Sequence, residues 1–268
     1  MRKIKNNNLG LLIVVFSLFW SNCQEPTTGC LDVNATNFDV TADKSCEDNC
    51  CTYPSLVVQA EHLFDTEKFS LNKKYKIEND SIEFLTFQFY LSDFQLIKAD
   101  NTIATTVDSV LLYRQTDSIK ILKNFVLAGK NIGFDFAVGK FDKPTQYTKV
   151  KFQVGLNANV NKAIPSRMPS DSPLSTKSDS MYINADKTYI FNKIVFTRKS
   201  KNDTVRIAIT TPQPLEIVKN LSFKQGFDAT IPLKINYLRF FKSVDFTQPQ
   251  NVIKQKIVDN TRSAFSIQ

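Results

Sequence analysis

The sequence predicts an all-β protein, an antiparallel β-sandwich or barrel with a small disulfide-rich segment at its N-terminus. Runs rich in β-branched and aromatic residues recur along most of the chain, and Asn, Asp, Lys, Pro or Gly bound them. Aromatic residues make up 12% of the chain and include 22 Phe, enough apolar bulk for one sizeable core. Helical periodicity is scarce. We expect three parts, which are residues 1–22, 23–54 and 55–268.

The N-terminus predicts export. Basic residues at positions 2, 3 and 5 precede an apolar run from Leu9 to Trp20, which is too short for a mature membrane span, and Cys23 follows soon after. A Cys at the first mature position is typical of a bacterial lipoprotein. We therefore expect residues 1–22 to be a lipoprotein signal peptide and Cys23 to be acylated. This would anchor the protein to the outer membrane of the cell envelope, on the periplasmic side or at the cell surface. The alternative is an ordinary signal peptide with a nearby structural Cys.

Residues 23–54 contain a polar tether and a Cys-rich segment with Cys30, Cys46, Cys50 and Cys51. Four cysteines in an exported, loop-rich segment predict two disulfides. A bond between the adjacent Cys50 and Cys51 would strain disulfide geometry, so we expect Cys30 and Cys46 each to pair with one of them. A zinc cluster is the alternative interpretation.

Residues 55–268 are predicted to form the main domain, built mostly from strands. The alternation is clear in residues 82–91, where Phe and Leu are separated by Thr and Gln. Asn202 and Asp203 predict a hairpin turn between two strands, and residues 253–259 predict a short helix. Further strands are expected at residues 107–114, 150–156, 189–197, 204–210 and 230–240.

Residues 157–180 interrupt this pattern with Pro165, Pro169 and Pro173 among polar residues. A loop of this length in a compact domain is usually functional or disordered. We interpret it as the best place for a binding surface, and simple disorder is the alternative.

The sequence contains no standard catalytic or nucleotide-binding motif. His62 is its single His, and no Cys lies beyond Cys51, so nucleophile–base pairs of the Ser–His or Cys–His kind are nearly excluded. We therefore expect no enzymatic activity. The net charge is +8, to which the signal contributes three, and the Lys residues are scattered rather than clustered. This distribution predicts no nucleic-acid partner.

The Cys-rich segment begins with Gly29-Cys30-Leu31-Asp32, continues through Asn37-Phe38-Asp39 and ends with Tyr53-Pro54. It resembles the short GCxDxxAxNFDxxA module of secreted Bacteroidota proteins. Closely spaced hard oxygen ligands could hold calcium, whereas Asp and Asn also cap turns with their side chains. The candidate calcium ligands are Asp32, Asn34, Asn37 and Asp39, followed in the sequence by Asp43.

Several segments of the main domain follow one another in a recognisable order. They are Glu61-His62, Phe69-Ser70-Leu71-Asn72 with Tyr75, residues 89–96, residues 152–157 with Asn161, Pro173 and Leu174, and a closing set within residues 233–267. Together they resemble the MbnP-like family, named for a copper-associated periplasmic protein. The resemblance implies copper handling, which in the founding family is tied to a modified tryptophan matured by a partner di-haem enzyme.

The chain departs from the family where members usually carry two tryptophans, in a stretch like MYWxWxxGY. Met181, Tyr182 and Tyr189 are kept, but Ile183 and Ala185 replace the tryptophans. A second His that the family carries near residues 112–114 is also absent.

His62 matches the family's early His, and imidazole suits copper. Met168 and Met181 are soft candidate ligands for Cu(I), and the alternative for His62 is a hydrogen-bonded structural role. We expect an envelope-anchored binding or accessory protein linked to copper handling, with a membrane contact through its lipid and a protein or small ligand as partner. The alternative is a surface interaction or adhesion module for a glycan or protein that has lost the copper site.

Overall fold

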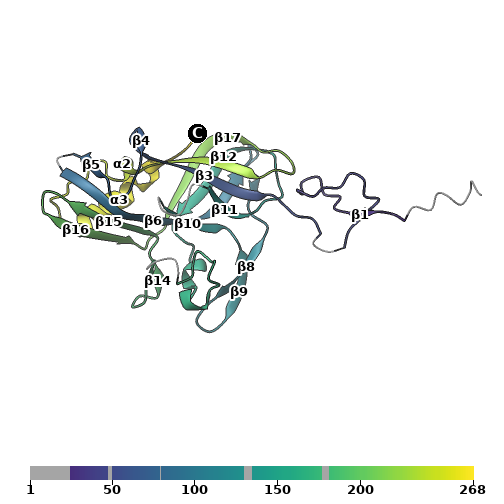
Figure 1. Cartoon of the computed structure of the whole chain (residues 1–268), viewed down its shortest axis with the longest axis horizontal. Coiled ribbons are helices and arrows are strands. Elements are labelled where there is room, and N and C mark those ends of the chain that lie inside the picture. The colour runs from purple at the N-terminus through teal and green to yellow at the C-terminus, as the bar shows by residue number, and fades with distance from the viewer. Residues whose placement is uncertain (1–24, 48–49, 79, 130–134, 177–180) are drawn as a thin grey trace, which may run out of the picture.

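The computed structural model describes residues 25–47, 50–78, 80–129, 135–176 and 181–268 (Figure 1). The expected signal peptide and Cys23 lie outside these residues. In the described chain no helix combines the length and the hydropathy that a membrane crossing requires. The described chain is mostly β, as predicted, and its strands form two main sheets and three small ones.

The larger sheet is organised around one long strand, β6 (Asp80–Ile97). Its ordered path is β16-β15-β6-β12-β17, and all its pairings are antiparallel. The β15–β16 hairpin confirms the turn expected near Asn202, which has a positive φ of 48°. The other strands of this sheet are β5 (Lys74–Ile77), β7 (Ile103–Ala104), β10 (Phe125–Gly129), β12 (Gln146–Val154), β15 (Asn192–Arg198), β16 (Asp203–Ile209) and β17 (Gln213–Ser222).

The smaller sheet joins the two ends of the main domain. At its centre β3 (Ser55–Phe64) lies beside β18 (Ala229–Asn236), and these two strands run parallel. The prediction of antiparallel pairing is therefore wrong for this pair. A parallel pair needs a long connection, and here most of the domain lies between the two strands. The sheet is completed by β4 (Glu67–Lys68), β11 (Asp135–Lys140) and β19 (Phe265–Ile267).

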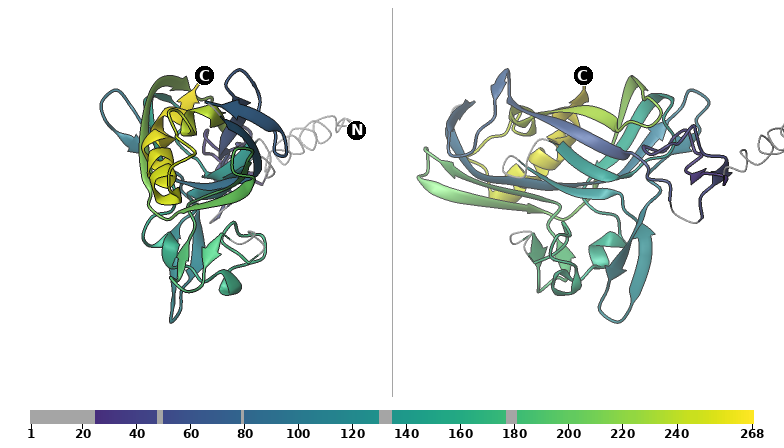
Figure 2. Two further views of the ribbon diagram at one scale, coloured as in Figure 1. Left: turned by 90° about the vertical axis from the view of Figure 1, so that its left-hand side faces the viewer. Right: turned by 45° about the vertical axis from the view of Figure 1, so that its right-hand side comes forward.

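The two sheets face each other across one aromatic core (Figure 2). Successive strand residues point to opposite faces, so alternate residues of β3, such as Leu56 and Val58, enter this core. From the larger sheet, Phe84, Phe87 and Phe89 enter it from β6. We call this the sandwich core.

The C-terminal residues close one end of the sandwich core with helices. The expected helix at residues 253–259 is confirmed as α3 (Gln250–Asn260). The expected strand at residues 230–240 is wrong beyond Asn236, because residues 237–240 form the helical turn α2 (Tyr237–Phe240). This turn buries Tyr237 and Phe240 completely, so apolar residues that resemble a strand in the sequence enter the core from a helix. A 3₁₀ turn, η3 (Thr261–Ala264), leads into β19.

A second lobe lies on the outer face of the larger sheet, seen below it in Figure 1. We define it as residues 109–122, 157–176 and 181–191. It has its own apolar cluster, which includes Leu112, Leu174, Met181 and Tyr189 together with Tyr90 of β6. Its elements are β8 (Ser109–Tyr113), β9 (Ser118–Leu122), η1 (Val160–Lys162), η2 (Pro165–Arg167), β13 (Tyr182–Ile183) and β14 (Thr188–Tyr189).

The Cys-rich segment is a small unit that precedes the sandwich. Its strands β1 (Thr28–Gly29) and β2 (Lys44–Ser45) pair in parallel. The structure joins Cys30 to Cys51 and Cys46 to Cys50. This is one of the two connectivities that the sequence left open once the bond between adjacent cysteines was set aside.

Candidate functional site

The second lobe contains a pocket of about 580 Å³. Its floor is Tyr90, which points away from the sandwich core because its neighbours Phe89 and Leu91 point into that core. Most of the remaining lining comes from the long loop and from the β13–β14 hairpin, and consists of Gln115, Ile164, Pro165, Ser166, Arg167, Ser175, Thr176, Met181, Tyr182, Asn184, Lys187 and Tyr189.

Two buried phenols hold one wall of the pocket. Tyr90 donates its hydroxyl to the carbonyl of Pro173 at 3.0 Å, and Tyr189 donates to the carbonyl of Leu174 at 2.7 Å. The two rings meet edge to face, with centroids 5.8 Å apart. Burial raises the pKa of both phenols, so both stay protonated and act as donors at neutral pH. Residues 169–176, which we call the strap, are thereby fixed to the sheet and to β14.

The hairpin on the other side of the pocket is fixed through Asn161. The side-chain oxygen of Asn161 accepts the backbone N–H of Tyr189 at 2.9 Å, and its amide donates to the hydroxyl of Thr188 at 2.9 Å. The turn of the hairpin ends at Lys187, which has a positive φ of 50°. The loop expected at residues 157–180 is thus ordered over residues 157–176, where it has buried apolar residues of its own, while residues 177–180 lie outside the described chain.

Arg167 is held at the rim of the pocket by its backbone surroundings. Its Nη1 donates to the carbonyls of Arg114 and Gln115, the latter at 3.2 Å. Its guanidinium also lies over the ring of Tyr113, 5.7 Å from the centroid. Arg167 is therefore an exposed cation that its hydrogen bonds and the ring of Tyr113 hold in position.

A second pocket of about 880 Å³ lies against the strap and is lined by Pro169 to Pro173 together with β10 residues such as Phe125 and Leu127. Ser175 lines both pockets. The strap is therefore a shared wall, and its position sets the shape of both spaces.

The structure places the candidate copper ligands in different cores. His62 is buried on β3, and its Nδ1 lies 2.8 Å from the hydroxyl of Tyr237, a residue of the sandwich core. Met168 and Met181 are buried in the second lobe. Ile183 packs on that same lobe and Ala185 is exposed. His62 is therefore not brought together with the two methionines, and it has the hydrogen-bonded structural environment that was its alternative interpretation.

The candidate calcium ligands are used to form turns. Asp32 accepts the backbone N–H of Asn34 at 2.9 Å and the hydroxyl of Tyr53 at 2.8 Å, and these bonds lower its pKa. Asp39 accepts both the N–H and the hydroxyl of Thr41, whose hydroxyl is the main cause of its lowered pKa. The side chain of Asn37 bridges Cys50 and Thr52. The calcium hypothesis therefore finds no support in the structure.

Among the described residues, the only group of three or more His, Cys, Asp or Glu whose ligand atoms converge is formed by Cys46, Cys50 and Cys51. Their sulfurs lie within 4.8 Å of one another, but all three are assigned to the disulfides described above. The described acids and His62 therefore form no additional group of this kind.

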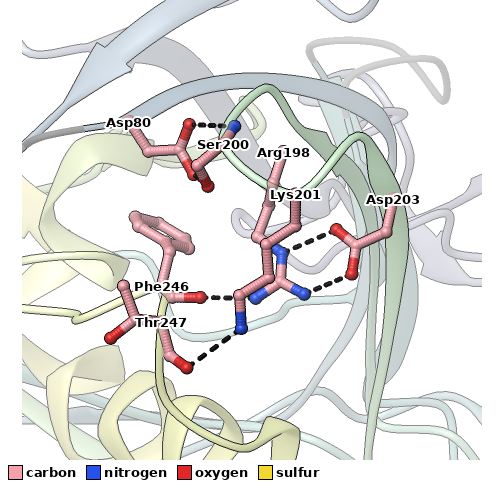
Figure 3. Close-up of polar contacts among 7 residues, drawn as sticks. All are labelled: Asp80, Arg198, Ser200, Lys201, Asp203, Phe246 and Thr247. Carbon is pink, nitrogen blue, oxygen red and sulfur yellow. Dashed lines mark hydrogen bonds and ion pairs between the residues drawn. The ribbon is translucent and has the colours of Figure 1, made fainter.

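A polar network at the far end of the sandwich was not predicted from the sequence (Figure 3). Arg198 is buried and forms a two-bond ion pair with Asp203 across the β15–β16 hairpin, while its Nη1 donates to the carbonyl of Phe246. Beside it, Asp80 accepts hydrogen bonds from the N–H and the hydroxyl of Ser200. The network ties the hairpin to the C-terminal loop, and its geometry indicates a structural role.

The comparison with family models agrees with the resemblance found in the sequence. The family model named MbnP matches residues 53–256, which is most of the chain. A solved structure, MbnP from Methylosinus trichosporium, is similar with 12% sequence identity and a TM-score of 0.45, covering 71% of this chain and 78% of that one. No curated protein matches the chain. Because the family model covers well over half of the sequence, this protein belongs to the MbnP family.

Proposed function

We propose that this protein is a non-enzymatic binding or accessory lipoprotein of the cell envelope, and that its binding site is the pocket of the second lobe. The observation that carries the proposal is the construction of that pocket. Two phenols anchor the strap, Asn161 anchors the hairpin, and Arg167 is fixed at the rim. Concave sites of this volume with apolar walls and a few placed polar groups are typical of ligand binding.

Membership of the MbnP family suggests a copper-associated accessory role, yet the candidate ligands in the described part of the chain do not fit a copper centre. A tight copper site gathers several nitrogen or sulfur ligands in a fixed geometry. Here His62 bonds to Tyr237 in one core, and Met168 and Met181 lie in the other. The side chains of Ile183 and Ala185 offer no donor atom. We therefore propose that any part this protein plays in copper handling does not use a centre built from these residues.

Anchoring to the envelope remains a proposal from the sequence, since Cys23 lies outside the described residues. It is supported by the basic start, the apolar run and the polar tether that follows Cys23. Metabolic labelling with a fatty-acid analogue tests it, and Cys23→Ser should abolish both labelling and membrane retention. Unchanged retention of the variant would refute the lipoprotein assignment.

The binding role is tested by comparing two measurements on the exported protein. Titration with Cu(I) and Cu(II) should show no stoichiometric tight site, in the wild type as in His62→Ala. A stoichiometric site that His62→Ala abolishes would overturn the proposal in favour of copper binding. Protein purified from its native host should carry a small molecule detectable by mass spectrometry, and this molecule should be reduced in Tyr182→Ala, which removes one pocket wall.

One observation favours the adhesion alternative. On the β8–β9 hairpin, Val110, Leu112, Ile119 and Ile121 pack into the second lobe, whereas Leu111 and Leu122 lie on the outer face and are 42% and 47% exposed. A protein ligand could bury these leucines. Under this alternative, Leu111→Ser with Leu122→Ser would abolish cell-surface or partner binding, while Tyr182→Ala would have no effect on it.

A further inference from the structure

The charged side chains among the described lining residues of the second-lobe pocket are all positive. Arg167 and Lys187 both line it, and none of the described residues in its lining carries a carboxylate. The other polar lining groups are neutral, for example Gln115 and Asn184. Within the described chain neither cation forms an ion pair. Two cations without acidic partners in a concave site favour a ligand with negative charge.

Two described acids lie close to these cations in the structure or in the sequence, and neither lines the pocket. Asp117 forms a two-bond pair with Arg114, which is the main cause of its lowered pKa, and Arg167 adds only a smaller contribution. Asp186 adjoins Lys187 in the hairpin turn but does not line the pocket. Among the described residues of the lining, no acid therefore offsets the charges of Arg167 and Lys187.

The guanidinium of Arg167 is held in place by Nη1, while its Nε and Nη2 groups can donate hydrogen bonds to a ligand. Its Nη1 is engaged by the carbonyls of Arg114 and Gln115, and Tyr113 supports its plane. No described residue accepts a hydrogen bond from its Nε or Nη2. A planar fork held in this way is suited to bind a carboxylate or phosphate with directed hydrogen bonds.

Apolar side chains and aromatic rings form much of the remaining lining, beside the neutral polar groups. Ile164, Pro165, Met181 and the ring of Tyr182 form its walls. The floor phenols, Tyr90 and Tyr189, direct their hydroxyl protons to the strap, so they present ring surface to the pocket. A ligand that fills this space therefore needs an apolar or aromatic body as well as a charge.

We infer that the pocket binds a small organic anion, with a carboxylate or phosphate group at Arg167 and Lys187 and an apolar body against Tyr182 and Met181. The inference rests on the proposed function, because it names the ligand class of the same site. It differs from a copper role in that no metal takes part.

The two methionines of the exported chain supply a specific probe. After the signal is removed, only Met168 and Met181 remain. Met181 lines the pocket, whereas Met168 is buried in the same lobe and does not line it. In protein labelled with ¹³C at the methionine methyl groups, a ligand in the pocket should therefore shift the Met181 resonance and leave that of Met168 nearly unchanged.

The experiment titrates the exported chain with benzoate, phenyl phosphate and the neutral analogue benzamide, and follows both resonances. At least one of the anions should shift Met181 saturably, at least tenfold more tightly than benzamide, and the stronger anion identifies the preferred group. A charge-assisted hydrogen bond contributes about 1.5–3 kcal/mol, so Arg167→Gln should weaken that anion about tenfold or more. Lys187→Gln should weaken it a few-fold. Lys224→Gln, which removes the same charge from the exposed β17–β18 loop, is the matched control and should have no effect.

The outcomes separate the ligand class from the binding role. If benzamide binds as tightly as the anions, or if Lys224→Gln weakens binding as much as Arg167→Gln, the anion inference is wrong while the pocket remains a binding site. If no probe shifts Met181 at millimolar concentration, the anion inference is also overturned. The proposed function is then decided separately by the native-ligand and copper measurements.

Discussion

Removing the phenol hydroxyl of Tyr189 should loosen the wall between the two pockets. Tyr189 is 1% exposed and donates to the carbonyl of Leu174 at 2.7 Å, and no other described group donates to that carbonyl. Tyr189→Phe keeps the ring, so it opens no large cavity, but it leaves a buried carbonyl without its donor. This loss costs about 1–3 kcal/mol. For a domain of this size, the melting temperature should fall by about 2–4 °C per kcal/mol.

The chain provides a matched control in the same hairpin. Tyr182 is only partly buried, and its hydroxyl makes no hydrogen bond to another described residue. Tyr182→Phe removes the same atom and should change stability by less than about 0.5 kcal/mol. Urea unfolding followed by circular dichroism measures both variants.

Limited proteolysis measures how firmly the strap itself is held. Trypsin can cleave after the exposed Arg167, next to the strap, and cleavage there should be faster in Tyr189→Phe than in Tyr182→Phe. Tyr90→Phe should cost about 1 kcal/mol, and the double variant should cost less than the sum because both phenols hold neighbouring carbonyls of one segment. If Tyr189→Phe is as neutral as Tyr182→Phe in both assays, the strap is not held by these phenols.

Three further predictions concern the rest of the chain. Asp203→Asn should lower the urea midpoint more than Asp117→Asn, since the partner Arg198 is 8% exposed and the partner Arg114 is 25% exposed; equal midpoints would argue against a structural role for the network in Figure 3. The hydrogen bonds from Arg198 lower the pKa of Asp203 below 3.8. This pair therefore stabilises the fold at pH values above the unfolded pKa, and the stabilisation is lost as the pH falls through the folded pKa. The difference in stability between wild type and Asp203→Asn should accordingly shrink as the pH is lowered from about 5 to 2. Mild reduction should destabilise the Cys-rich segment, where the Cys30–Cys51 bond spans 21 positions and contributes about 3 kcal/mol. It should leave the strand signal in circular dichroism unchanged, because the sandwich core contains no Cys. Loss of that signal would show that the two parts are coupled.

The strands were predictable because their evidence is local. In residues 82–91 the alternation of Phe and Leu with Thr and Gln is the pattern of a strand with one face in a core, and β6 includes all of them. The helix at residues 250–260 was likewise found from its own residues. The parallel pairing of β3 with β18 was missed because its partners lie at the two ends of the domain, and no local pattern encodes such a contact.

The loop of the pocket could be predicted from the sequence, but the long-range contacts that build the pocket could not. Its loop was identified from three prolines and low apolar content, but the hydrogen bond from Tyr90 to Pro173 spans 83 positions and leaves no trace in either segment. The environment of His62 depends on Tyr237, 175 positions away. The sequence could identify a lone imidazole, but it could not decide between a ligand and a buried structural residue.

One strand, β6, connects the sandwich core with the second lobe. On β6, Phe89 faces the sandwich core and Tyr90 faces the second lobe, so the same backbone positions both sets of contacts. The hairpin with Ile183 and Ala185 packs in the second lobe and against Tyr90, and the sandwich core contains no residue of that hairpin. Substitutions in the hairpin can therefore change the chemistry of the pocket without altering the packing between the sheets. The family model spans residues 53–256, a range that includes both the sandwich and the second lobe. Under the proposed function, the second lobe is therefore the part of the chain in which substitutions should change ligand binding and leave the sandwich core intact.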